Sequence, residues 1–203
     1  MPTMIDIIGA TILAGMVMLI IVGVTANLNQ TLYMSTFSLN VQTSAIALAR
    51  IIEHDFYKMG YDISKSSPVI LQADSNRFMF WMGRILPGGS IQKTRVTYYT
   101  DQTTTGPIVS TTRNPRDRMF YRVEEASTIS ANIGVTQLHF TYFDSAGIQL
   151  SVTNLPLSER LRIKAIRVKI FIESPEPVGR YSDPADTTYM GVYWEKLIYP
   201  RNL

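Results

Sequence analysis

Few side chains in this sequence could carry acid–base, nucleophilic or metal chemistry, and their spacing does not bring them together. The 203 residues include two histidines and no cysteine, which excludes thiol catalysis, disulfides and cysteine-ligated metals. His54 lies on the polar side of an expected helix and His139 alternates with apolar neighbours in an expected strand, so we interpret both as structural. The sequence contains no nucleophile–base set, metal-ligand spacing or glycine-rich phosphate loop, and we expect neither an enzyme nor a bound cofactor.

A basic loop is the candidate for ligand binding. It contains Arg113, Arg116 and Arg118. Aromatic residues and a further arginine alternate in other expected strands: Arg77, Phe78, Phe80, Trp81, Tyr98 and Tyr99. We favour a solvated loop and aromatics that serve the core or an interface, and keep nucleic acid as an alternative partner. Asp183 and Asp186 are too few ligands to predict calcium in their loop, and we expect no metal.

Asp6 is the only charged residue before Arg50, and a long apolar run follows it at 7–26. A helix of about 20 apolar residues matches the ~30 Å hydrocarbon layer of a bilayer, so we expect this run to cross a membrane. No basic stretch precedes it, as a cleaved secretory signal would require. The carboxylate either has a functional partner or lies at the interface, where it favours the positive helix N-terminus. Small residues within the run allow close approach of other helices: Gly9, Ala10, Ala14, Gly15 and Gly23.

The helix is expected to continue beyond the membrane as an amphipathic half. Residues 27–49 are uncharged. From Val41 onward, apolar residues recur at spacings of three and four. This stripe comprises Val41, Ala45, Leu48, Ile52, Phe56 and Met59, and its last four residues are expected to pack on a sheet. Gly60 tolerates the left-handed conformation common at helix ends. We therefore expect a membrane half at 1–26 and an amphipathic half at 27–60.

Residues 61–203 are expected to form one domain with a largely antiparallel sheet. Short runs rich in β-branched and aromatic residues alternate there with turn residues, without helical patterns between them. The expected strands are 69–73, 77–82, 95–99, 119–123, 134–143, 148–152, 166–172 and 190–199. A short helical turn is expected within 155–161. The fold class is therefore α+β, with a long N-terminal helix packed on the sheet.

Several segments resemble, in their order along the chain, the minor subunits of type IV pilus-like machines. Residues 3–6 (Thr-Met-Ile-Asp) stand where that family has Thr-Leu-Ile-Glu, and Pro2 stands at its first mature position. The helix ending at 47–61 is similar to the Leu-Ala-Arg-Asp-Leu-Arg-Met-Ala-Gly-Tyr ending of PilW-type minor pilins. J-type minor pseudopilins of type II secretion belong to the same group. Further similar segments are 135–144, 162–168 and 200–203.

Two departures from the family accompany this resemblance. The acidic residue is Asp6 rather than glutamate, one methylene shorter. The family's prepilins carry a short basic leader that ends in glycine, whereas only Met1 precedes Pro2 in this sequence. Either the numbering starts near the mature end or removal of Met1 exposes Pro2.

The resemblance implies a pilin-like fold and a structural role in a filament. Asp6 would pair with the terminal amine of a neighbouring subunit, which in this chain would be Pro2. The implied partners are other pilin or pseudopilin subunits, an inner-membrane assembly platform and, before assembly, membrane lipid. The implied location is the bacterial inner membrane and then a periplasmic or extracellular filament.

We favour a minor subunit that primes assembly or caps the tip. A major filament subunit and a single-pass membrane-anchored domain that never assembles remain alternatives. The sequence leaves open whether a pilus, a secretion pseudopilus or DNA uptake is served.

Overall fold

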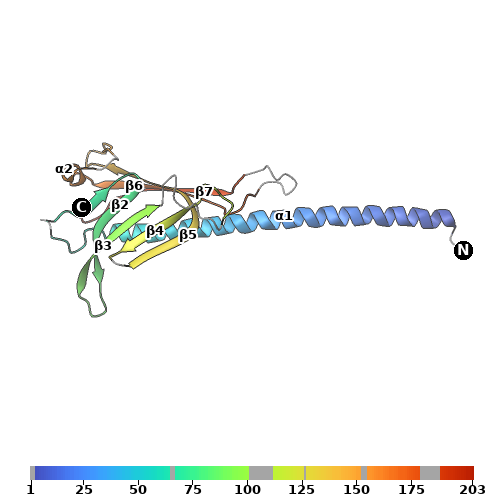
Figure 1. Ribbon diagram of the computed structural model, residues 1–203, viewed down its shortest axis with the longest axis horizontal. Coiled ribbons are helices and arrows are strands. Elements are labelled where there is room, and N and C mark those ends of the chain that lie inside the picture. The colour runs from blue at the N-terminus through green and yellow to red at the C-terminus, as the bar shows by residue number, and fades with distance from the viewer. Residues whose placement is uncertain (1–2, 65–66, 101–111, 126, 152–154, 179–187) are drawn as a thin grey trace.

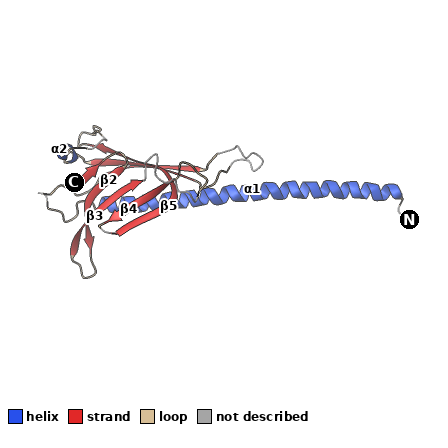
Figure 2. Ribbon diagram, viewed as in Figure 1, coloured by secondary structure: helices blue, strands red, loops and turns tan. Residues whose placement is uncertain are grey.

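A long helix and a curved antiparallel sheet make up the molecule, which confirms the expected α+β class. The computed structural model describes residues 3–64, 67–100, 112–125, 127–151, 155–178 and 188–203. The helix projects far out of the sheet domain, so that the N-terminus lies at one end of the molecule and the C-terminus at the other (Figure 1). Only the C-terminal part of the helix lies against the strands (Figure 2).

Helix α1, Met4–Tyr57, is one uninterrupted helix of 54 residues. At ~1.5 Å per residue it is about 80 Å long. It ends three residues before Gly60, with Lys58 as its C-cap, so the expected boundary at 60 was slightly too late. Gly60 has φ +73°, and a Cβ there would lie 2.6 Å from the carbonyl oxygen of Asn202. Glycine is therefore required both by the left-handed turn and by the close approach of the C-terminal segment.

The seven strands form a meander in which each strand pairs antiparallel with the next, so the order across the sheet is the order along the chain. The strands are β1 Ile70–Ala73, β2 Arg77–Ile85, β3 Ile91–Thr100, β4 Arg118–Glu124, β5 Ser127–Phe143, β6 Ala165–Glu173 and β7 Gly191–Ile198. A short helix, α2 Leu157–Arg160, confirms the helical turn expected before β6. Helix α1 contacts β5, β6 and β7.

One expected strand, 148–152, is wrong. In its described part only Gln149 pairs with the sheet, through an isolated bridge to Phe143. The preceding turn accounts for this, because the Asp144 carboxylate accepts the backbone N–H groups of Ala146 and Ile148, each at 2.9 Å. This cap fixes a compact turn, and the returning segment remains beside the end of β5, where the Leu150 N–H donates to the Tyr142 carbonyl at 2.9 Å, without forming a strand. The other seven expected strands are present, and β2, β3 and β5 are longer than expected.

The core lies between the sheet and the last turns of α1. Leu48, Ile52, Phe56 and Met59 are all buried there, as the sequence predicts. Phe56 is at the centre, and its ring lies among four aromatic rings of the sheet at centroid distances of 5.3–6.3 Å. These rings belong to Phe78, Phe80, Tyr98 and Phe140.

Replacing Phe56 by Ala is expected to lower the free energy of unfolding of the sheet domain by about 3–5 kcal/mol, because it leaves a cavity in a closely packed aromatic cluster. Tyr57→Ala is the matched control, because Tyr57 is next to Phe56 in the helix but 44% exposed. Its effect is expected to stay within about 0.5 kcal/mol. Denaturant titration of the full chain in detergent micelles, followed by near-UV circular dichroism, measures both. Equal losses for the two variants would contradict this description of the core.

Candidate functional site

The first candidate site is the free part of α1. Nearly all side chains from Thr3 to Asn40 are exposed, and the helix is long and apolar enough to span a membrane. The five small residues singled out above lie on this exposed part. A Cβ added at Gly9, Gly15 or Gly23 would meet no atom within 4 Å. Their surface is therefore available for contact with another helix.

Asp6 closes the N-terminus of this helix. Its Oδ2 accepts the Thr3 backbone N–H at 2.9 Å and the Thr3 hydroxyl at 2.6 Å. The Asp6 N–H donates in return to Thr3 Oγ1 at 3.4 Å, which completes a capping box. Oδ1 forms no hydrogen bond to any described residue. Pro2, the expected partner position in a neighbouring subunit, lies outside the described residues.

A second candidate is a buried polar cluster that ties α1 to the sheet. Asp55 is 2% exposed and faces the strands from the helix. Its Oδ2 accepts the Tyr98 hydroxyl at 2.5 Å and Arg122 Nε at 2.8 Å. Arg122 also donates through Nη1 to Glu124 at 2.7 Å, and Arg84 approaches the other Glu124 oxygen at 2.9 Å. Negative and positive side chains thus alternate from the core to the surface, in the order Asp55, Arg122, Glu124 and Arg84.

The protonation states follow from this arrangement. Burial and the adjacent Asp55 carboxylate raise the pKa of Tyr98 well above its usual value, so its hydroxyl remains a donor. Burial opposes the charge of Arg122, but its hydrogen bonds to Asp55 and Glu124 outweigh that cost and hold its pKa above the usual value. The members of the cluster contact one another directly, and Asp55 and Tyr98 are buried. The cluster is suited to fixing the helix on the sheet.

The sequence analysis did not identify this cluster, although one signal for it was present. Asp55 follows Ile52 by three residues and precedes Met59 by four, so it stands on the apolar stripe of the helix. A carboxylate on such a stripe requires a buried partner. Its partners Tyr98 and Arg122 come from β3 and β4 and could not be identified from helical spacing.

The basic loop is held by ion pairs. Arg116 lies 2.9 Å from Glu173, a buried carboxylate at the end of β6, and Arg113 lies 3.5 Å from Glu176. Arg118 is the first residue of β4. The three arginines therefore do not form one cluster of unpaired cations. Two of them pair with carboxylates at the end of β6 and just after it, Glu173 and Glu176.

The two histidines remain apart from each other and from any set of catalytic groups. The side chain of His54 is 62% exposed, and its Nδ1 lies 3.2 Å from Asp55 Oδ1. His139 is exposed on β5. Within the described ranges, no group of three or more His, Asp or Glu residues could hold a metal ion. Asp183 and Asp186 lie outside those ranges.

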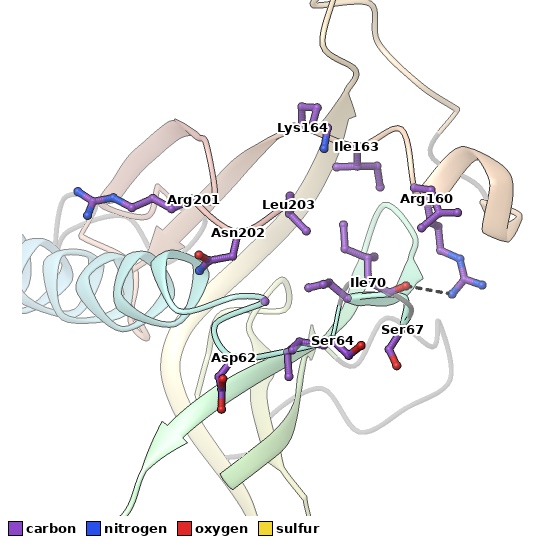
Figure 3. A pocket seen from close by; sticks show the side chains of 14 residues that line it. Asp62, Ser64, Ser67, Ile70, Arg160, Ile163, Lys164, Arg201, Asn202 and Leu203 are labelled. Carbon is purple, nitrogen blue, oxygen red and sulfur yellow. Dashed lines mark hydrogen bonds between the residues drawn. The ribbon is translucent and has the colours of Figure 1, made fainter. Parts of the chain in front are cut away.

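A cleft of about 600 Å³ opens between the segment that follows Gly60 and the C-terminal residues (Figure 3). Ile70 and Ile163 supply apolar lining (Figure 3). The charged residues of the lining are Arg160, Lys164 and Arg201, which are positive, and Asp62, which is negative. The Arg160 Nη1 donates to the Ile70 carbonyl at 3.5 Å, which holds the guanidinium at one side. The cleft can accommodate an apolar group beside an anionic one. It contains no paired acid and base.

The chain matches no protein-family model, and no curated protein matches it. The observations that bear on function are those of the molecule itself. They are a long exposed apolar helix, its capped N-terminus, and a sheet domain fixed rigidly to the other end of that helix.

Arg122→Ala is expected to destabilise the sheet domain by about 3–5 kcal/mol, because it leaves the buried Asp55 carboxylate without its cation. Arg84→Ala is the matched control, since Arg84 contacts the same Glu124 but its side chain is 58% exposed. Its loss is expected to be below about 1 kcal/mol. Thermal unfolding of both variants at neutral pH measures the difference. A larger effect at Arg84 than at Arg122 would contradict the proposed role of the cluster.

Proposed function

We propose that this protein is a structural subunit of a type IV pilus-like filament, a minor pilin or pseudopilin that primes assembly or caps the tip. One observation carries the proposal: the exposed part of α1 is longer than a membrane requires. From Met4 to Asn40 it extends roughly 55 Å at ~1.5 Å per residue, whereas the hydrocarbon layer is ~30 Å thick. Nearly half of this exposed helix therefore lies beyond a bilayer.

The excess length is uncharged, and apolar side chains alternate along it with neutral polar ones. Leu28, Leu32, Tyr33 and Leu39 are between 48% and 64% exposed on it. A lone membrane anchor would leave these side chains in water, which is costly for a surface of this extent. Helices of neighbouring subunits would cover them in a filament core, where the absence of charge between Asp6 and Arg50 is an advantage.

Within such a filament the small residues would allow helices to approach closely, and Asp6 would pair with the terminal amine of a neighbour. A carboxylate and an ammonium attract strongly in a low-dielectric core, and their pairing offsets the cost of removing both from water. The subunit would wait in the inner membrane before assembly. Its partners would be other pilins and the assembly platform, and the sheet domain would face outward.

The proposal assigns no catalytic role. Two buried carboxylates are engaged in structural ion pairs, Asp55 with Arg122 and Glu173 with Arg116. A role as a major subunit uses the same helix contacts and differs in abundance.

A charge placed on the exposed helix is expected to block incorporation. Leu32→Glu leaves the sheet domain untouched, since Leu32 is 64% exposed and precedes the docked part of α1. We expect normal membrane insertion but at least a tenfold loss from sheared filaments, because an unpaired carboxylate would be buried in the core. Tyr57→Glu is the control, because it adds the same charge to a helix turn that already carries charged residues. Full incorporation of Leu32→Glu would contradict the proposal.

The two roles of Asp6 can be separated by substitution. Asp6→Asn keeps a side-chain oxygen that can accept the Thr3 N–H but removes the charge, whereas Asp6→Glu keeps the charge. We expect Asp6→Asn to insert into the membrane and fail to assemble, and Asp6→Glu to assemble. Immunoblots of membrane and sheared-filament fractions measure both. Normal assembly of Asp6→Asn would show that the carboxylate serves only as a local helix cap.

A further inference from the structure

The sheet presents one face to α1 and the other away from it. Phe78, Phe80 and Tyr98 point toward α1, so the residues that alternate with them on β2 and β3 point outward. With the matching residue of β4 they form what we call the outer β2–β4 face: Arg77, Trp81, Lys93, Arg95, Tyr99 and Tyr121. This face is independent of the helix surface used in the proposed filament.

Aromatic rings and cations alternate across the outer β2–β4 face. Tyr99 and Tyr121 lie opposite each other on β3 and β4, with ring centroids 4.8 Å apart and an interplanar angle of 11°. The Arg77 guanidinium lies 5.1 Å from the Tyr99 ring centroid, and the Lys93 ammonium lies 4.3 Å from that of Trp81. The three rings are half-buried, whereas the cations are exposed at the ends of flexible side chains.

The cations of this face differ from those of the basic loop. None of Arg77, Lys93 and Arg95 forms an ion pair within the part of the chain that the structure describes. Glu125 lies at the border of the face, where its carboxylate accepts the Arg95 backbone N–H at 2.7 Å. The face therefore keeps a positive balance. An anion can approach it without displacing an internal carboxylate from these three side chains.

The register sets the distance between the two aromatic positions. Trp81 stands opposite Arg95, and Tyr99 stands opposite Arg77, four residues further along β3. At ~3.4 Å per residue these rows are about 14 Å apart. A chain that runs along the strands would meet Trp81 with Arg95 beside it in the first row, and Arg77, Tyr99 and Tyr121 in the second row.

We propose that the outer β2–β4 face binds single-stranded nucleic acid, with bases stacked on Trp81 and on the Tyr99–Tyr121 pair and with phosphates held by Arg77, Lys93 and Arg95. Planar rings interleaved with unpaired cations are the combination that single strands require, since every base has a π-face and every linkage a negative charge. A duplex hides its base faces. A lipid surface would lie at the far end of α1, remote from β2 and β3 (Figure 1).

The first test measures binding of fluorescein-labelled oligothymidylate to the full chain in detergent micelles, by fluorescence anisotropy at several salt concentrations. Arg77→Ala combined with Lys93→Ala is expected to weaken binding and to lower the slope of log affinity against log salt by about 1.4, the value for two lost phosphate contacts. Arg167→Ala combined with Lys169→Ala removes the same charge from side chains that are paired with Glu195 at the surface, and it is expected to leave binding unchanged. No binding by the native chain, or equal weakening by both pairs, would overturn the proposal.

The second test separates stacking from charge. In a Trp194→Phe background Trp81 is the only tryptophan, and a base stacked on it is expected to quench its fluorescence. Trp81→Phe is expected to keep the affinity, and Trp81→Ala to lose at least about fivefold. Because Trp81→Ala could also weaken the fold, the thermal midpoint is measured with it, and the quenching signal tests stacking without that variant. Absence of quenching, or displacement of oligothymidylate by an acidic polysaccharide of equal charge as efficiently as by unlabelled oligothymidylate, would show binding by charge alone and overturn the proposal.

Discussion

The inner face of the sheet must be covered by the last turns of α1, and the rest of the structure depends on that contact. A seven-stranded meander is a single layer, so its apolar face cannot be buried by strands alone. Phe56 supplies the apolar centre of the contact and Asp55 the polar one, through Tyr98 and Arg122. Because a buried ion pair is sensitive to geometry, this pairing specifies one position of the helix on the strands.

Because the C-terminal end of α1 is packed on the sheet, its N-terminal end is left exposed for contacts outside the domain. The last turns of the helix pack on the sheet, whereas most side chains before Val41 are exposed. This attachment places the sheet domain at the opposite end of α1 from its apolar N-terminal segment (Figure 1). A helix that is packed on its own domain at one end and exposed at the other is suited to a subunit whose exposed helix becomes buried against the helices of neighbouring subunits.

The sequence predicts the parts of the fold that local periodicity determines. The apolar spacing through Leu48, Ile52, Phe56 and Met59 indicates the buried helix face, and alternation in 166–172 indicates a strand with one apolar face. Both are confirmed. The strand expected at 148–152 fails because the Asp144 side chain decides the path of the backbone there, and a propensity pattern does not contain that information.

Among the candidate sites, too, some can be predicted from the sequence and others depend on the three-dimensional structure. The exposed part of α1 and the role of Asp6 can be predicted from the sequence, because residues 7–26 are apolar and no charged residue lies between Asp6 and Arg50. The Asp55 cluster and the outer β2–β4 face depend on strand register, which brings together residues far apart in sequence. The alternation of Trp81 and Tyr99 with core aromatics is visible in the sequence, but the cation above each ring is not.

The most direct test of the filament assignment is the stoichiometry of this protein in sheared extracellular filaments, by quantitative mass spectrometry that also identifies the N-terminal peptide. The account predicts a trace amount relative to another pilin, with a mature chain that starts at or near Pro2. An amount equal to the bulk filament would make it the major subunit instead. Complete absence from filaments, with the protein retained in the inner membrane, would contradict the assignment.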